Sequence, residues 1–153
     1  MANLWWPMWH RGGRLEELDA GECRRLLAGT AVGRLGYQTV RGPRIVPMNY
    51  ALVGDSIITR TAPDTEIARF AAKQTVAFEI DQADEYLQRG WSVLVVGELR
   101  VISAEAIRML APGQTPDPWP EGPRSVFLQL GIEELTGRRV HPAHERAPSR
   151  IND

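Results

Sequence analysis

Alternating apolar and polar positions recur through the middle of the chain and predict short β-strands separated by tight turns. Two of these turns place glycine beside proline or aspartate, at Gly42-Pro43 and Gly54-Asp55, as antiparallel hairpins often do. The predicted strands cover residues 31–39, 44–53, 56–61, 75–81, 91–102 and 124–135, with 136–140 extending the last one. Six strands at this short spacing favour a mainly β, α+β fold built as an antiparallel barrel rather than from β–α–β units.

Short helical segments are predicted between the strands. Asp19 followed by Glu22 has the spacing of a capping box and places a helix at about 20–28. Two further short helices are expected, at about 64–72 and 104–110. Residues 111–123 carry five prolines and are expected to be irregular.

A chain of 153 residues favours a single folded domain, which we place at residues 15–140. Residues 1–14 form a tryptophan-rich N-terminal arm, and residues 141–153 have the composition of a flexible C-terminal tail. We expect the arm to pack on its own domain or on a partner subunit, because exposed aromatic side chains at this density favour aggregation. A membrane-surface anchor and a ligand lid are the alternatives for the arm.

Composition and charge exclude several classes of function. The net charge of −1 provides no basic field for nucleic acid, and the single cysteine, Cys23, excludes a disulfide framework and cysteine-rich zinc sites. No apolar run approaches the ~20 residues of a membrane span, and the first residues lack the pattern of a signal peptide, so a cytoplasmic protein is expected. His141 and His144 lack a third ligand, and no nucleophile motif occurs, so neither a metal site nor a catalytic residue is predicted.

Polar side chains gather where two neighbouring strands end, at residues 47–50 and 59–61. Such a site offers hydrogen-bonding groups without acid–base residues, which suits a protein that orients a flat, phosphorylated cofactor. Met48 and Trp91 are expected to provide apolar walls, and Arg44 and Arg60 to anchor the phosphate. Hydrogen bonds to the cofactor are expected from Asn49, Thr59, Thr61 and Ser92.

Seven segments, in this order, carry a family resemblance: ELDAGECRRLLAGTAVGRLGY, RIVPMNYAL, GDSIITRTAPDTEI, VAFEID, GWSVLVVGELRVI, PWPEGPR and LTGRRV. With them the chain resembles the pyridoxamine 5′-phosphate oxidase-like family of FMN-binding split barrels, in the actinobacterial-type branch that includes nitroimidazole-resistance-like reductases. The resemblance implies a homodimer that holds FMN, or in some branches a deazaflavin coenzyme, in a groove between the subunits. It implies cofactor contacts from Arg44, Val46, Pro47, Met48, Asn49, Tyr50, Thr59, Arg60 and Thr61, with Trp91 and Ser92 reaching in from the partner subunit.

One segment departs from the family pattern. Related sequences read RTAPGTK, with a lysine that binds the cofactor phosphate, whereas this chain has Asp64 and Glu66 at the glycine and lysine positions. Replacing that attraction by a repulsion costs on the order of 1–3 kcal/mol. The leading expectation is an FMN-binding oxidoreductase-like protein that acts on a small molecule. A deazaflavin-dependent reductase, and a non-catalytic split barrel that has lost FMN and binds another planar molecule, are the alternatives.

Overall fold

One antiparallel sheet of eight strands forms the framework of residues 12–143, the part of the chain that this computed structural model describes. The strands are β1 (Arg14–Leu18), β2 (Val32–Thr39), β3 (Gly42–Val53), β4 (Ser56–Thr61), β5 (Thr75–Asp84), β6 (Arg89–Val101), β7 (Val126–Gly131) and β8 (Glu134–His141). The helical segments are α1 (Ala20–Ala28), the π-helical turn η2 (Ile67–Ala71) and α2 (Ala104–Arg108). Most of the predicted N-terminal arm and C-terminal tail lies outside the described residues.

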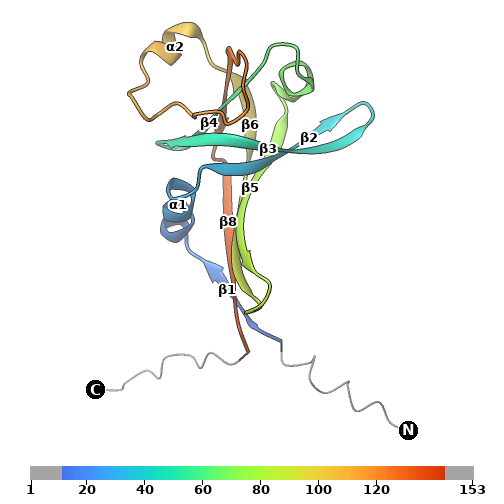
Figure 1. Ribbon diagram of the computed structural model, residues 1–153, viewed down its shortest axis with the longest axis vertical. Coiled ribbons are helices and arrows are strands. Elements are labelled where there is room, and N and C mark those ends of the chain that lie inside the picture. Colours follow the sequence, from blue (N-terminus) through green and yellow to red (C-terminus); the bar gives the residue numbers. More distant parts are fainter. Residues whose placement is uncertain (1–11, 144–153) are drawn as a thin grey trace.

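Six of the strands close into a ring. The sheet order is β1-β8-β6-β5-β2-β3-β4-β7, and an additional pairing between β6 and β7 joins the ring's ends. Strand β6 makes this possible because Gly90–Val96 pair with β8, whereas Leu99–Val101 pair with β7. β8 and β1 therefore extend the sheet beyond the ring, and β5, β6 and β8 run along the length of the molecule while β2 and β3 cross them (Figure 1). The prediction of a mainly β antiparallel fold is confirmed.

The sheet has eight strands, two more than the six predicted for the barrel. The six predicted strands correspond to the ring, β2 to β7. Residues 124–140 were expected to form one continuous strand, but the chain turns at Ile132 and Glu133, whose N–H groups bond to Asp55 and Val96. β1 escaped prediction because its sequence, RLEEL, is mostly charged and pairs only with β8 at the sheet edge.

The core fills the ring with side chains that alternate inward along its strands. Phe78, Ile80, Val93, Val95, Leu99 and Leu128 are all fully or almost fully buried. Helix α1 covers part of this core through Cys23, Leu26 and Leu27, and Asp19 caps the helix by accepting a hydrogen bond from the Glu22 N–H at 2.8 Å, as predicted. No helix within residues 12–143 is long and apolar enough to cross a membrane.

Tyr50 of β3 bonds to α1 and also packs against β5. The Tyr50 hydroxyl donates a 2.6 Å hydrogen bond to the Leu27 carbonyl, and the Tyr50 ring meets Phe78 edge-on with centroids 5.0 Å apart. Burial raises the pKa of Tyr50 to about 12, so this hydroxyl stays protonated and keeps donating at neutral pH. These contacts hold the middle of β3 in place, immediately beside the predicted cofactor-binding residues.

Candidate functional site

A cavity of about 160 Å³ lies beside β3 and β4, against residues of the proline-rich segment. Its lining residues are Val46, Pro47, Met48, Asn49, Arg60, Thr61, Thr65, Ile67, Pro116, Pro118, Pro120 and Arg124. The lining thus combines apolar surface with two arginines and contains no carboxylate. In a chain of net charge −1, this is a local concentration of positive charge.

Strand β3 presents a free edge to this region. Its residues as far as Asn49 pair with β2, but pairing with β4 begins only at Tyr50. On the second edge, the residues before Tyr50 therefore have no strand partner within the described part of the chain. Unpaired backbone groups along a strand edge are ready donors and acceptors for a ligand that lies against it.

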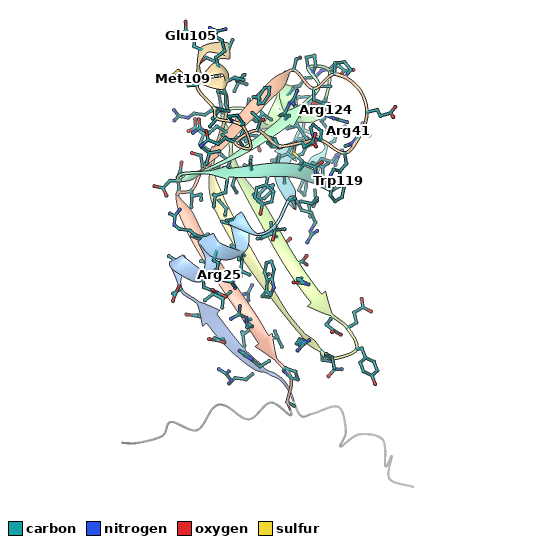
Figure 2. All side chains as sticks on the ribbon, turned by 60° about the vertical axis from the view of Figure 1, so that its left-hand side comes forward. Arg25, Arg41, Glu105, Met109, Trp119 and Arg124 are labelled. Carbon is teal, nitrogen blue, oxygen red and sulfur yellow. The ribbon has the colours of Figure 1, made fainter. Side chains whose placement is uncertain are left out.

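The proline-rich segment is fastened to the strands at two points. The Asn49 side-chain oxygen accepts a 3.0 Å hydrogen bond from the Trp119 backbone N–H, and Arg60 Nε donates a 3.0 Å bond to the Arg124 carbonyl. The Arg60 guanidinium also lies over the Phe127 ring, 4.5 Å from its centroid. Trp119 and Arg124 lie at the same end of the molecule, well away from Arg25 on α1 (Figure 2). The proline-rich segment therefore forms one wall of the cavity and is fixed in place by these two hydrogen bonds.

The hydroxyl groups of the two threonines at the cavity form hydrogen bonds with each other and with the backbone. Thr61 Oγ1 lies 2.8 Å from Thr65 Oγ1, and the Thr65 hydroxyl donates to the Ala62 carbonyl at 2.9 Å. Thr65 Oγ1 also accepts from the Ala68 N–H at 3.3 Å. Because each hydroxyl has a single hydrogen, the Thr65 proton goes to Ala62 and the Thr61 proton to Thr65. These threonines shape the turn before η2 and leave the arginines as the donors for an anionic ligand.

The structure brings together six of the residues predicted to bind a cofactor. These are Val46, Pro47, Met48, Asn49, Arg60 and Thr61, all of which line the cavity. Tyr50 and Thr59 point elsewhere: Tyr50 bonds to Leu27, and the buried Thr59 hydroxyl donates to the Asn49 carbonyl at 3.0 Å. Their predicted role in cofactor contact stays a prediction.

Trp91 and Ser92 lie away from this cavity within the single chain. Both line a hollow of about 620 Å³ that runs along the β5–β6 hairpin and β8, and Trp91 also lines an adjoining hollow of about 710 Å³. A contact of either residue with a ligand beside β3 would require a second copy of the chain, as the sequence-based expectation states.

Arg44 and Glu66 engage each other outside the cavity lining. Arg44 Nε lies 3.7 Å from Glu66 Oε2, which also accepts a 3.5 Å hydrogen bond from the Tyr37 hydroxyl. Burial and the Glu66 carboxylate raise the pKa of Tyr37. Neither Asp64 nor Glu66 lines the cavity. The carboxylate expected to repel a phosphate is thus turned toward Arg44, and Arg44 in turn is committed to that carboxylate.

The sequence missed two contributors to the cavity. One is the proline wall, and the other is Arg124, which lines the cavity and has a buried Nε without a hydrogen-bond partner in residues 12–143. The only sequence signal for the wall was Trp119 within a run of prolines, because prolines restrict a loop to few conformations. No local pattern indicates that residues near 120 return to β3.

Comparison with known proteins finds relatives over most of the described residues. A family model described as pyridoxamine 5′-phosphate oxidase matches residues 19–139. An uncharacterized protein of Mycobacterium tuberculosis is 31% identical over 142 residues, which cover 86% of this chain and 89% of the relative. The solved FAD-binding protein of Mycobacterium smegmatis is 28% identical with a TM-score of 0.64, covering 82% of this chain and 98% of that one. An FAD-binding protein of Mesorhizobium loti is 25% identical with a TM-score of 0.70, covering 84% and 98%.

Proposed function

Because the chain belongs to the pyridoxamine 5′-phosphate oxidase family, we propose that it binds a flavin nucleotide in the cavity beside β3 and β4 and serves flavin-dependent electron transfer. The observation that carries the proposal is the lining, which joins an apolar wall to two arginines without a carboxylate. A flavin nucleotide has matching chemistry, because its ring system is flat and largely apolar while its phosphate is anionic. The two FAD-binding proteins at 28% and 25% identity support the same ligand class.

Each part of the cavity has a distinct task in this proposal. The free edge of β3 offers backbone groups to the polar rim of the flavin ring system, and Met48 and the prolines provide apolar contact to it. Arg60 and Arg124 provide the charge for phosphate. When bound, the flavin would supply the redox chemistry, and the lining residues would orient it and exclude water.

The site is completed by a second copy of the chain in this proposal. A cavity of about 160 Å³ is smaller than the roughly 300–1,000 Å³ of typical small-molecule sites, so part of the ligand must be enclosed by something else. The outer face of the ring provides a surface for that copy. Two rows of paired residues cross it, Leu94–Glu79–Arg34–Pro47 and Val96–Ala77–Gly36–Ile45.

This face is partly apolar and reaches the cavity. Ile45 is 73% exposed and Leu94 is 37% exposed, although both belong to an otherwise well-packed sheet. Pro47 belongs both to the face and to the cavity lining, so a copy seated on the face would also adjoin the ligand. Ser92 precedes Leu94 by two residues and shares its side of β6, which supports including Ser92 in the proposed contact.

Either FMN or FAD satisfies this proposal, and a deazaflavin coenzyme is the alternative that uses the same edge of β3. FMN is the ligand expected from the sequence, whereas the names of the two relatives favour FAD. All these ligands bear a phosphate group, so the demand for positive charge at the cavity is common to them.

The test is titration of the purified protein with riboflavin, FMN, FAD and a deazaflavin coenzyme, followed by gel filtration and a visible spectrum of the protein peak. We expect retained flavin bands and a dimeric mass. The variant Leu94→Asp should shift the mass toward the monomer and release the flavin, while Val40→Asp, at a 90% exposed position in the β2–β3 turn, should change neither. A wild-type protein that retains none of these ligands would overturn the proposal.

A further inference from the structure

The arginines of the described chain divide by how their charge is balanced. Among residues 12–143, the half-buried arginines are Arg24, Arg34, Arg44, Arg60, Arg124 and Arg139. Four of them pair with carboxylates: Arg24 with Asp55, Arg34 with Glu79 and Asp81, Arg44 with Glu66, and Arg139 with Glu22. Arg60 and Arg124 have no carboxylate partner among the described residues, and they are the two arginines that line the cavity.

Of these two arginines, Arg124 has fewer hydrogen-bond partners for its guanidinium. Its Nε is the only buried side-chain nitrogen or oxygen without a hydrogen-bond partner among residues 12–143. Leaving a buried donor of a charged group unpaired is costly, and such groups are normally satisfied by protein, water or ligand. Arg60, in contrast, uses its Nε on the Arg124 carbonyl and one face of its guanidinium on Phe127.

From this balance we infer that Arg124 is the principal phosphate-binding residue of the cavity and that Arg60 holds it in position. The inference rests on the proposed function, and it assigns the anion subsite to the proline-rich wall rather than to the turn before η2. The other polar groups near the turn are already engaged. Thr61 and Thr65 bond to each other and to the backbone, and Arg44 is paired with Glu66.

The assignment also accounts for the carboxylate at position 66. A cation supplied by the wall leaves the residue in the turn free to make another contact, and Glu66 makes one with Tyr37 and Arg44. The Arg124 carbonyl accepts a hydrogen bond from Arg60 Nε, so the backbone at Arg124 is held before any ligand arrives. A guanidinium that is already positioned binds phosphate with a smaller loss of side-chain entropy.

The experiment compares the variants Arg124→Gln and Arg124→Lys with wild-type protein, using riboflavin, FMN and FAD. Riboflavin has the flavin ring system but no phosphate group, so the ratio of FMN affinity to riboflavin affinity isolates the phosphate contact. We expect Arg124→Gln to weaken FMN and FAD roughly ten- to a hundredfold, the scale of one charge-assisted hydrogen-bond set, and to leave riboflavin unchanged. Arg124→Lys keeps the positive charge but loses the paired N–H donors of the guanidinium, so its FMN affinity should fall between those of the wild type and Arg124→Gln. Arg108→Gln, at an exposed position of α2, is the matched control.

A second measurement does not depend on flavin binding. Thermal unfolding with inorganic pyrophosphate, against chloride at equal ionic strength, should show stabilisation of the wild type and of Arg108→Gln but not of Arg124→Gln. Equal loss of riboflavin and FMN affinity, or pyrophosphate stabilisation that survives in Arg124→Gln, would overturn the assignment to Arg124. Pyrophosphate stabilisation that requires Arg124, in a protein that binds no flavin, would support the anion subsite and reject the flavin proposal. Circular dichroism of each variant separates a lost contact from a lost fold.

Discussion

The side-chain oxygen of Asn49 accepts a hydrogen bond from the backbone N–H of Trp119, 70 positions further along the chain, at 3.0 Å. Asn49 is the last residue of β3 that pairs with β2, so this bond ties the proline-rich wall to the place where β3 changes partners. The bond gives Asn49 a task distinct from the predicted cofactor contact, because its oxygen already has a protein donor.

Asn49→Ala is therefore expected to loosen the wall. Loss of one hydrogen bond of about 0.5–1.5 kcal/mol should raise the fraction of molecules in which the proline-rich segment is detached from β3 by roughly two- to tenfold. The measurement is limited trypsin digestion, with cleavage after Arg124 quantified against cleavage after Arg108 by mass spectrometry. Asn49→Asp keeps an acceptor for the Trp119 N–H and should digest like the wild type. Equal digestion of Asn49→Ala and wild type would show that the bond does not hold the wall.

Tyr50→Phe is expected to destabilise the protein by about 1–3 kcal/mol. The change leaves the Leu27 carbonyl without the hydroxyl that donates to it, in a position where Tyr50 is only 5% exposed. Urea unfolding followed by circular dichroism measures the loss. The matched change Tyr86→Phe, at a side chain 94% exposed, should alter the unfolding free energy by less than about 0.5 kcal/mol. Similar values for the two variants would contradict the role given to this hydroxyl.

Gly97→Ala is expected to disturb closure of the ring. A Cβ at Gly97 would overlap the Gly131 backbone oxygen, at the point where β6 passes from β8 to β7. Because backbone rather than a flexible side chain stands in the way, we expect a loss at the upper end of the roughly 1–3 kcal/mol of overpacked sites. Gly131→Ala is the control, since its Cβ would meet no atom within 4 Å. Thermal unfolding of both variants decides, and equal melting temperatures would refute the steric argument.

The Glu22 carboxylate makes stability sensitive to acid. Hydrogen bonds from Arg25 and then Arg139 lower the pKa of Glu22 from 4.5 to about 2, and the Arg139 contact ties β8 to α1. A lowered pKa in the folded state means that the contribution is full above pH 4.5 and is lost as the pH falls toward 2. Glu22→Gln should therefore unfold at lower urea concentration than the wild type at pH 6, with the difference shrinking toward pH 2. Equal urea midpoints of Glu22→Gln and the wild type at pH 6 would contradict this role of the carboxylate.

The sequence predicted the ring better than its extension, for a physical reason. The ring strands are joined by short turns or cross the core with clear alternation, so glycine, proline and apolar periodicity are sufficient to place them. β1 and β8 pair with each other across most of the chain length, and their mostly polar residues leave no comparable pattern.

The candidate site divides in the same way. Residues 46–49 and 60–61 could be placed together because they lie on adjacent strands of one hairpin, just beyond the Tyr50–Thr59 pair. Arg124 and the proline wall could not, since their approach to β3 depends on the Asn49–Trp119 and Arg60–Arg124 bonds between distant residues. The pairing of Glu66 with Arg44 was also beyond the sequence, because it depends on how the turn before η2 directs the Glu66 side chain.

β6 has a consequence for how the protein unfolds. This one strand pairs with β5, β7 and β8, so it is shared by the ring and by the two-strand extension. Residues Gly90–Val96 are paired on both edges, with β5 and with β8, so separation of either part would leave β6 with an unpaired edge. The central amides of β6 should consequently exchange with deuterium only through global opening, which makes the domain a single cooperative unit rather than a stable ring with an independently melting flap.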